Sequence, residues 1–121
     1  AIRNGYTLAI GGDFSEPGID RETQCMMVPT FDIPGPYIDD AARQFRFGNQ
    51  TTTDDHAVHL VGVYTGPDGD WFLIKDSGSG SRDGKHSGYF FMHEDFAKLK
   101  IMTYTVHKDA VQAILQQFAN R

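Results

Sequence analysis

Two neighbouring segments in the middle of the chain constrain its fold the most. Residues 54–64 and 71–80 each contain a run of apolar and β-branched side chains, and Thr65–Asp70 between them carries the Pro, Asp and Gly of a tight turn. They predict an antiparallel hairpin, in which the start of the first strand lies beside the end of the second. His56 opens the first strand and Asp76 closes the second. We therefore expect these two side chains to lie close together at the open end of the hairpin.

A histidine beside an acid is a recognisable part of a catalytic site. The acid holds the imidazole in one tautomer and stabilises the imidazolium ion that forms during nucleophilic catalysis. A nucleophile is missing from this pair, because Ser77 should point away from Asp76, and Ser79 and Ser81 lie in a glycine-rich loop without a nucleophile elbow. From the residues alone, His56 and Asp76 are either half of a catalytic triad or ordinary side chains of a β domain.

Cys25 is the only cysteine, which excludes an internal disulfide bond and a cysteine-based zinc site. No histidine and no helix start lie near it in the sequence, so nothing there favours a thiolate. We expect Cys25 to behave as a small, partly buried apolar residue. The weaker alternative is a small self-contained enzyme that uses Cys25 together with His56.

Metal and phosphate sites are not favoured by the spacing of the polar residues. His56 and His59 are three positions apart on a predicted strand, and an odd offset places their rings on opposite faces. His59 lies deeper in the hairpin, and we expect it to be a core or interface residue. Asp68 and Asp70 lack the calcium-loop pattern, and the glycine-rich loop lacks the spacing of a phosphate-binding loop. We expect no metal and no cofactor.

Composition and charge exclude two further classes of partner. The 121 residues are 40% hydrophobic and 22% charged, which is ordinary for one globular domain. The net charge of −5 argues against nucleic acid, which needs clustered Lys and Arg. The apolar runs are too short for a membrane span. No targeting segment is visible, and the sequence assigns no compartment.

The remaining elements indicate an α+β domain in which strands dominate. β-Branched and aromatic residues predict further strands at 6–10, 88–92 and 101–106. A short helix is predicted at 41–45, a short helical or turn connection at 93–99, and a last helix at 110–118, with apolar residues at helical spacing and Asp109 as its cap. Residues 21–36 form a long irregular segment. Residues 1–5 resemble the end of a helix, with Gly5 in the left-handed conformation. Because that helix has no beginning and the chain opens on Ala1, we expect that upstream residues were removed.

Four stretches together resemble one peptidase family. They are Thr-Asp-Asp-His-Ala-Val-His-Leu-Val-Gly-Val from Thr53, Trp-Phe-Leu-Ile-Lys-Asp-Ser-Gly from Trp71, Gly-Tyr-Phe-Phe from Gly88, and the tail from Tyr104 to Val111. They are similar to the C-terminal half of papain-like cysteine peptidases, most of all to the bleomycin hydrolase and aminopeptidase C branch. The resemblance extends over about Gly5 to Val111. It implies a mostly antiparallel, barrel-like sheet with short helices.

The resemblance implies that His56 is the general base for a cysteine thiolate and that Asp76 orients it. Two positions depart from the family. The orienting residue is usually Asn, and a carboxylate favours the protonated imidazole more strongly. The indole that usually shields the pair should follow Ser77, where this chain has Gly78. Less shielding admits more water, so either activity is altered or another feature compensates.

The family's nucleophilic cysteine belongs to an N-terminal domain, and the expected Gln-then-Cys-Trp segment does not occur here. We therefore expect residues 1–121 to be one domain, the C-terminal part of a two-domain peptidase that is inactive alone. Its partners would be a peptide substrate and the N-terminal half. A non-catalytic binding or inhibitory module that reuses the fold is the alternative. A separated half should expose an apolar face and self-associate or bind a partner chain. The candidate residues are Phe31, Tyr37, Phe45 and Phe47.

Overall fold

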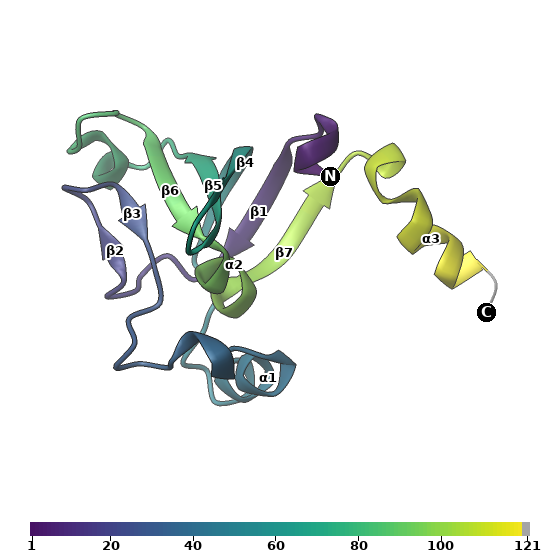
Figure 1. The fold of residues 1–121 in the computed structure, drawn as a ribbon, viewed down its shortest axis with the longest axis horizontal. Coiled ribbons are helices and arrows are strands. Elements are labelled where there is room, and N and C mark those ends of the chain that lie inside the picture. The colour runs from purple at the N-terminus through teal and green to yellow at the C-terminus, as the bar shows by residue number, and fades with distance from the viewer. Residues whose placement is uncertain (120–121) are drawn as a thin grey trace.

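The protein is built around one seven-stranded sheet (Figure 1). The computed structural model describes residues 1–119. The strands lie in the order β2-β3-β6-β5-β4-β1-β7, and all described neighbours are antiparallel except β3 and β6. Their bounds are β1 (Leu8–Gly12), β2 (Ile19–Asp20), β3 (Cys25–Met26), β4 (His56–Gly66), β5 (Gly69–Lys75), β6 (Tyr89–His93) and β7 (Ile101–Val106). The α+β class and the mostly antiparallel pairing are confirmed. The sheet is open, with β2 and β7 at its edges, and does not close into a barrel.

Within residues 1–119 the strands are accompanied by three short α-helices and four 3-10 helices. They are η1 (Ile2–Asn4), η2 (Gly35–Tyr37), α1 (Asp40–Gly48), η3 (Ser79–Arg82), α2 (Glu94–Lys100), η4 (Lys108–Val111) and α3 (Gln112–Ala119). The prediction of short helices in these regions is confirmed. α1 begins after Asp39, whose carboxylate accepts the Ala42 N–H at 2.8 Å. Gly5 has the expected left-handed conformation, with φ 83°.

The cap predicted at Asp109 is wrong. His107 precedes η4, and its Nδ1 accepts the Asp109 N–H at 3.3 Å. Asp109 instead lies in the first turn, where a negative charge is favourable because the free N–H groups of a helix start carry partial positive charge.

The hydrophobic core lies between the sheet and α2. α2 contacts β5, β6 and β7, and its Phe96 and Leu99 are fully buried. From the sheet, the buried core residues are Ile10, Met26, Val58, Leu60, Ile74, Phe90, Met92 and Ile101. In β4 the buried residues alternate with exposed ones, as expected for a strand that packs through one face.

One irregularity in the β4–β5 hairpin decides which side chains share a face. On the side of Val61 nearer the hairpin turn, Gly62 pairs with Leu73. On the other side of Val61, Leu60 pairs with Ile74. Val61 therefore has no partner and forms a β-bulge. A slip of one residue moves every later side chain to the other face of the sheet.

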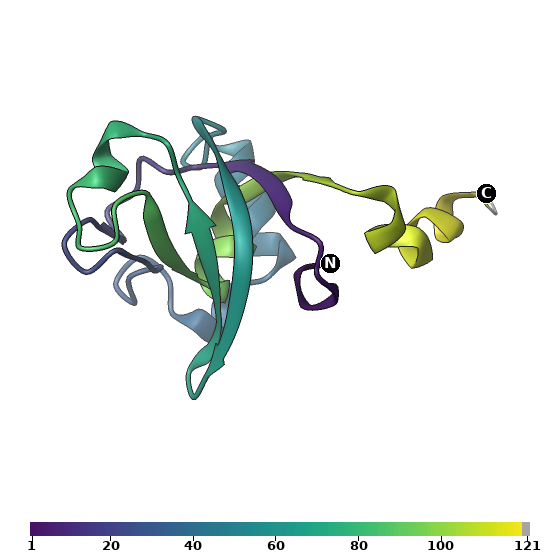
Figure 2. The ribbon, with the colours of Figure 1, turned by 90° about the horizontal axis from the view of Figure 1, so that it is seen from above.

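α3 extends away from the sheet at the C-terminal side of the molecule (Figure 2). Its apolar side chains Ile114, Leu115 and Phe118 are exposed. The four aromatic residues expected on an apolar face, Phe31, Tyr37, Phe45 and Phe47, are exposed as well. None of the helices within residues 1–119 is long and apolar enough to cross a membrane.

Candidate active site

His56 and Asp76 are hydrogen-bonded at the open end of the hairpin, as the sequence predicts. Nε2 of His56 lies 2.8 Å from Oδ1 of Asp76, and their side chains are 39% and 12% exposed. His56 is the first residue of β4 and pairs with Gly12 of β1. Asp76 directly follows β5, and its N–H donates to the Gly88 carbonyl at 2.9 Å. Both ends of the pair are thus fixed by backbone hydrogen bonds.

The hydrogen bond also fixes the tautomer of His56. An ionised carboxylate only accepts hydrogen bonds, so Nε2 carries the proton and donates it to Asp76. Within residues 1–119, Nδ1 makes no hydrogen bond. His56 therefore has its second nitrogen free to accept a proton from an incoming group.

The loop after β5 holds the Asp76 carboxylate and leaves no serine nucleophile. Oδ1 of Asp76 also accepts the Gly78 N–H at 2.8 Å. The buried Ser81 hydroxyl lies 3.0 Å from the Asp76 carbonyl oxygen and 2.7 Å from the Gly78 carbonyl oxygen. Its one proton is shared between these two acceptors. Ser81 is committed to this loop, and Ser77 and Ser79 are exposed without contact to His56.

Phe14 packs on the imidazole from the other side. The rings of Phe14 and His56 meet edge to face, with centroids 5.6 Å apart and planes at 78°. The Phe14 N–H donates to Oδ1 of Asp55 at 2.9 Å, so the residue next to His56 holds the ring that covers it. Such a contact fixes the imidazole by packing.

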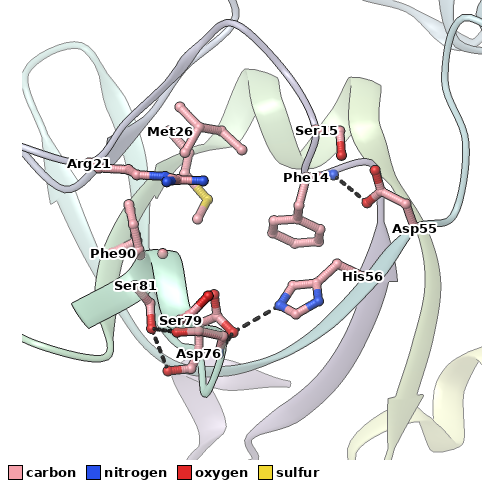
Figure 3. A pocket seen from close by; sticks show the side chains of 13 residues that line it. Phe14, Ser15, Arg21, Met26, Asp55, His56, Asp76, Ser79, Ser81 and Phe90 are labelled. Carbon is pink, nitrogen blue, oxygen red and sulfur yellow. Dashed lines mark hydrogen bonds and ion pairs between the residues drawn. The ribbon is translucent and has the colours of Figure 1, made fainter. Parts of the chain in front are cut away.

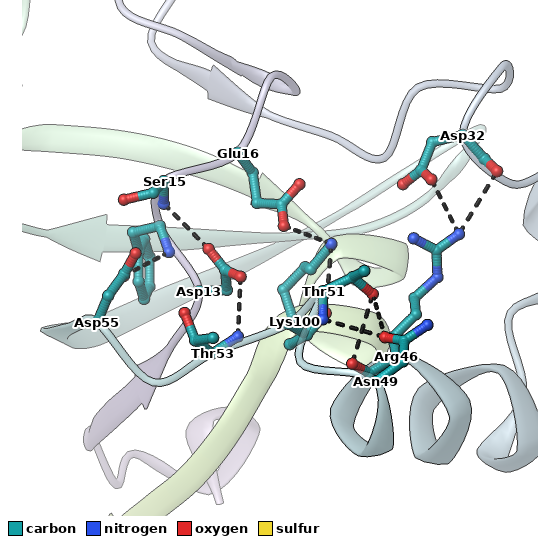
Figure 4. A network of polar contacts seen from close by, with 12 residues as sticks. Asp13, Ser15, Glu16, Asp32, Arg46, Asn49, Thr51, Thr53, Asp55 and Lys100 are labelled. Atoms are coloured by element: carbon teal, nitrogen blue, oxygen red, sulfur yellow. Dashed lines mark hydrogen bonds and ion pairs between the residues drawn. The ribbon is translucent and has the colours of Figure 1, made fainter.

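A buried polar network supports the segment around Phe14, from Asp13 to Glu16 (Figure 4). The Asp13 carboxylate accepts the N–H groups of Ser15 and Thr53 at 3.2 and 2.9 Å. Lys100 Nζ lies 2.5 Å from Oε1 of Glu16, with side chains only 3% and 14% exposed. Burial raises the pKa of the Glu16 carboxyl, although Lys100 acts in the opposite direction. Desolvation thus outweighs attraction in this pair.

A second buried side chain fixes the glycine-rich loop. Gln24 has a left-handed backbone, with φ 57°, and is almost fully buried. Its amide nitrogen donates to the carbonyls of His86 and Tyr89 at 2.8 and 2.7 Å, and its oxygen accepts the His86 N–H at 2.7 Å. A Cβ at Gly84 would collide with Gln24, so the loop passes this close only because it has glycine there.

These elements surround a pocket of about 280 Å³ (Figure 3). His56 and Asp76 line one side, and Arg21 enters from the opposite side. Apolar side chains line part of the wall: Ile19, Met26 and Phe90. The pocket is a cleft beside the histidine, deep enough for one side chain of a ligand.

The structure does not bring Cys25 to His56. Cys25 and Met26 are consecutive in β3, so their side chains point to opposite faces. Met26 lines the pocket of His56, and Cys25 does not. The Cys25 thiol instead lies 3.6 Å from the Thr23 carbonyl.

The prediction for His59 is half correct. Val58 is buried and lies on the same face of β4 as His56, which is two residues before it. His59 is the next residue after Val58 and lies on the other face. His59 is exposed, however, and not a core residue, and its Nε2 contacts Thr7 Oγ1 at 2.9 Å. Nowhere in residues 1–119 do three His, Cys, Asp or Glu side chains gather to hold a metal ion.

The sequence did not indicate the roles of two residues that line the pocket, Phe14 and Arg21, or of Gln24, which holds the glycine-rich loop beside it. All lie in segments without periodicity, and each acts through residues distant in the chain. The only available signal was the length of the irregular segment at 21–36, since such loops often border functional sites.

Comparison with known proteins adds no relative. No protein-family model matches the sequence, and no curated protein matches it. The functional argument therefore rests on the geometry of the pocket and on the residues that line it.

Proposed function

We propose that this chain is the histidine-bearing C-terminal domain of a papain-like cysteine peptidase of the bleomycin hydrolase and aminopeptidase C type. In this proposal the nucleophilic cysteine comes from an N-terminal half of the same peptidase. The substrate is a peptide, bound in a cleft between the two halves. The single observation that carries the proposal is the 2.8 Å bond from His56 to Asp76, which leaves Nδ1 free beside a pocket.

The geometry supports a two-step hydrolysis. Nδ1 of His56 takes the proton of the cysteine thiol, and Asp76 stabilises the imidazolium ion through Nε2. The thiolate attacks the peptide carbonyl, and the imidazolium returns the proton to the leaving amine. Water then attacks the thioester, giving its proton to Nδ1. The acid product leaves, and the thiol is restored.

The two departures from the family pattern fit together in the structure. A Cβ at residue 78 would lie 3.2 and 3.3 Å from the two carboxylate oxygens of Asp76, which is tighter than ordinary contact. Gly78 avoids this crowding and donates its own N–H to Oδ1. A backbone donor thus offsets the negative charge of Asp76 where the family has a neutral amide. This pairing supports the catalytic reading.

Reconstitution tests the proposal. The chain is mixed with the cysteine-bearing N-terminal half of the peptidase, and hydrolysis of a fluorogenic aminopeptidase substrate is followed with and without a thiol-alkylating reagent. We expect alkylation-sensitive hydrolysis that the His56→Ala chain does not support. A folded, associated complex with no hydrolysis would contradict the proposal.

The exposure of His56 favours a second candidate function, a binding or inhibitory module. The side chain of His56 is 39% exposed even with Phe14 against it, and Gly78 supplies no indole to shield the pair. A binding or inhibitory module would tolerate such exposure, because it needs no water exclusion. Stable binding of the full-length protein to a peptide or protein, without turnover, would favour this candidate.

A further inference from the structure

Arg21 lies on the side of the pocket opposite His56 (Figure 3). Its guanidinium rests on the glycine-rich loop. A Cβ at Gly80 would lie 2.8 Å from Cζ and 2.9 Å from Nη2 of Arg21, so the absence of a side chain at Gly80 makes the room for the cation. The loop therefore presents Arg21 to the pocket.

The guanidinium has no acidic partner in the described part of the chain. No hydrogen bond or ion pair joins Arg21 to another residue between 1 and 119. Its sequence neighbour Asp20 accepts from the Thr23 hydroxyl at 2.7 Å and the Glu22 N–H at 3.0 Å instead. A guanidinium carries five N–H donors and no acceptor, so Arg21 faces the pocket with its donors unused.

The two carboxylates of the pocket are already occupied. Asp55 accepts the Phe14 N–H, and Asp76 accepts from both His56 and Gly78. These contacts turn the negative charges toward the protein's own donors. Arg21 is the one Lys or Arg among the residues that line this pocket in the described part of the chain. An incoming acidic group thus meets an unpaired positive charge.

The rest of the pocket selects the shape of that group. Ile19, Met26 and Phe90 offer an apolar surface in the same pocket as the guanidinium. The exposed Ser79 hydroxyl lies at the rim. A short aliphatic arm that ends in a carboxylate matches both features, because arginine binds carboxylates through two parallel hydrogen bonds.

We propose that Arg21 is a specificity-determining residue that gives this pocket a preference for peptides with a glutamate side chain beside the reacting bond. The inference rests on the proposed peptidase function for its meaning in catalysis. The binding preference itself is a property of this chain alone and is tested without turnover.

The test is peptide binding followed by NMR. The chain is titrated with N-acetyl-alanyl-glutamyl amide and with its glutaminyl counterpart, while the Arg21 Nε–H and the His56 ring resonances are observed. We expect the glutamyl peptide to bind about tenfold more tightly, a difference of about 1.4 kcal/mol, because a carboxylate pairs with the guanidinium more strongly than a neutral amide does. The preference should shrink as ionic strength rises, because salt screens exposed charges.

Two variants and one control separate charge from position. Arg21→Gln removes the charge, and Gly80→Ala displaces the guanidinium while keeping the charge; both should bind the two peptides equally. Lys85→Gln removes a cation of the same loop that does not line the pocket, and it should keep the preference. Unchanged backbone spectra establish that each variant is folded.

The outcomes distinguish this inference from the proposed function. Equal binding of both peptides by the unmodified chain, or failure of both peptides to shift Arg21, would overturn the role of Arg21. A glutamyl preference that depends on Arg21 supports it even if reconstitution yields no hydrolysis. In that case the pocket is the acidic-ligand site of a binding module.

Discussion

His56 and Asp76 are joined across a diagonal of the β4–β5 ladder, not across a direct pair. Between the bulge and the open end of the hairpin, His59 pairs with Lys75. The next residues along the two strands are Val58 and Asp76, which are therefore level with each other. Val58 shares the inner face with His56, so Asp76 points to that face too. If Val61 paired regularly with Ile74, with no bulge, Asp76 would be level with His59 and would share the outer face. The bulge therefore assembles the pair.

The first prediction concerns the two partners of this bond. In the reconstituted peptidase, His56→Ala should lower kcat/KM by about a hundredfold or more, because general base catalysis contributes at least that much. Asp76→Ala should also lower it strongly, whereas Asp76→Asn keeps an acceptor for Nε2 and should lower it much less. Steady-state kinetics measures all three. Equal losses for Asp76→Asn and Asp76→Ala would show that the charge, not the hydrogen bond, is what His56 requires.

The second prediction concerns the glycine-rich loop. Gln24→Ala removes the three hydrogen bonds that tie Gln24 to His86 and Tyr89, although the His86 carbonyl still accepts the Tyr89 N–H at 2.9 Å. An unsatisfied buried group costs about 1–3 kcal/mol, so we expect the free energy of unfolding to fall by about 3 kcal/mol. Urea denaturation measures this loss.

The same variant should free the loop before the whole chain unfolds. Hydrogen exchange of the His86 amide should accelerate more than that of Ile74 in the core. Glu22→Ala, an exposed neighbour on the same turn, is the matched control and should change neither quantity. Uniform acceleration at every amide would show that Gln24 supports the whole fold and not this loop.

The sequence predicts much of this fold because local signals agree with it. The strand Ile101–Val106 is found as predicted, and α1 includes the helix predicted at 41–45. That His56 and Asp76 lie at the same end of the hairpin also follows from the sequence, whereas the face that they share depends on the bulge. The bulge at Val61 was missed, although a glycine within a strand, here Gly62, often accompanies such an irregularity.

The surroundings of the pair were less predictable, for a physical reason. Gln24 acts on His86, which is far away in the sequence, and Arg21 rests on Gly80. No periodicity encodes such contacts, because they arise only when the sheet brings its two ends together. Polar side chains in loops look solvated in a sequence. Whether they are buried is decided by residues elsewhere.

The third prediction concerns pH and the buried Glu16. Burial raises the pKa of this carboxyl above its ordinary value of 4.5. The native state then holds the carboxyl proton more tightly than the unfolded state. The resulting contribution to stability is full below the ordinary pKa of 4.5 and is lost as pH rises through the raised pKa of the native state. Relative to Glu16→Gln, the free energy of unfolding should fall as pH rises above 4.5. Urea denaturation at several pH values measures it, and a rise with pH above 4.5 would contradict the sign.

The fourth prediction concerns the partner of that carboxyl. Lys100→Met leaves Glu16 buried without its cation and should lower the free energy of unfolding by about 3 kcal/mol. The double variant Glu16→Leu/Lys100→Met should recover most of this loss, since both desolvated charges are gone. Lys98→Met is the control, because the Lys98–Glu94 pair is largely exposed and should be worth less than about 1 kcal/mol. Additive losses at Glu16 and Lys100 would contradict the coupling.

The fifth prediction concerns the exposed aromatic residues near α1. Phe31 and Phe45 line one surface hollow with their side chains 85% and 71% exposed, and burying two such rings would favour association. We expect the isolated chain to self-associate at high concentration and Phe31→Ser/Phe45→Ser to remain monomeric, as measured by sedimentation. Stability should change by less than about 0.5 kcal/mol, because neither ring supports the core. Phe118→Ser on α3 tests the other exposed apolar face. If only that variant abolishes self-association, α3 is the docking surface and the aromatic residues near α1 are not.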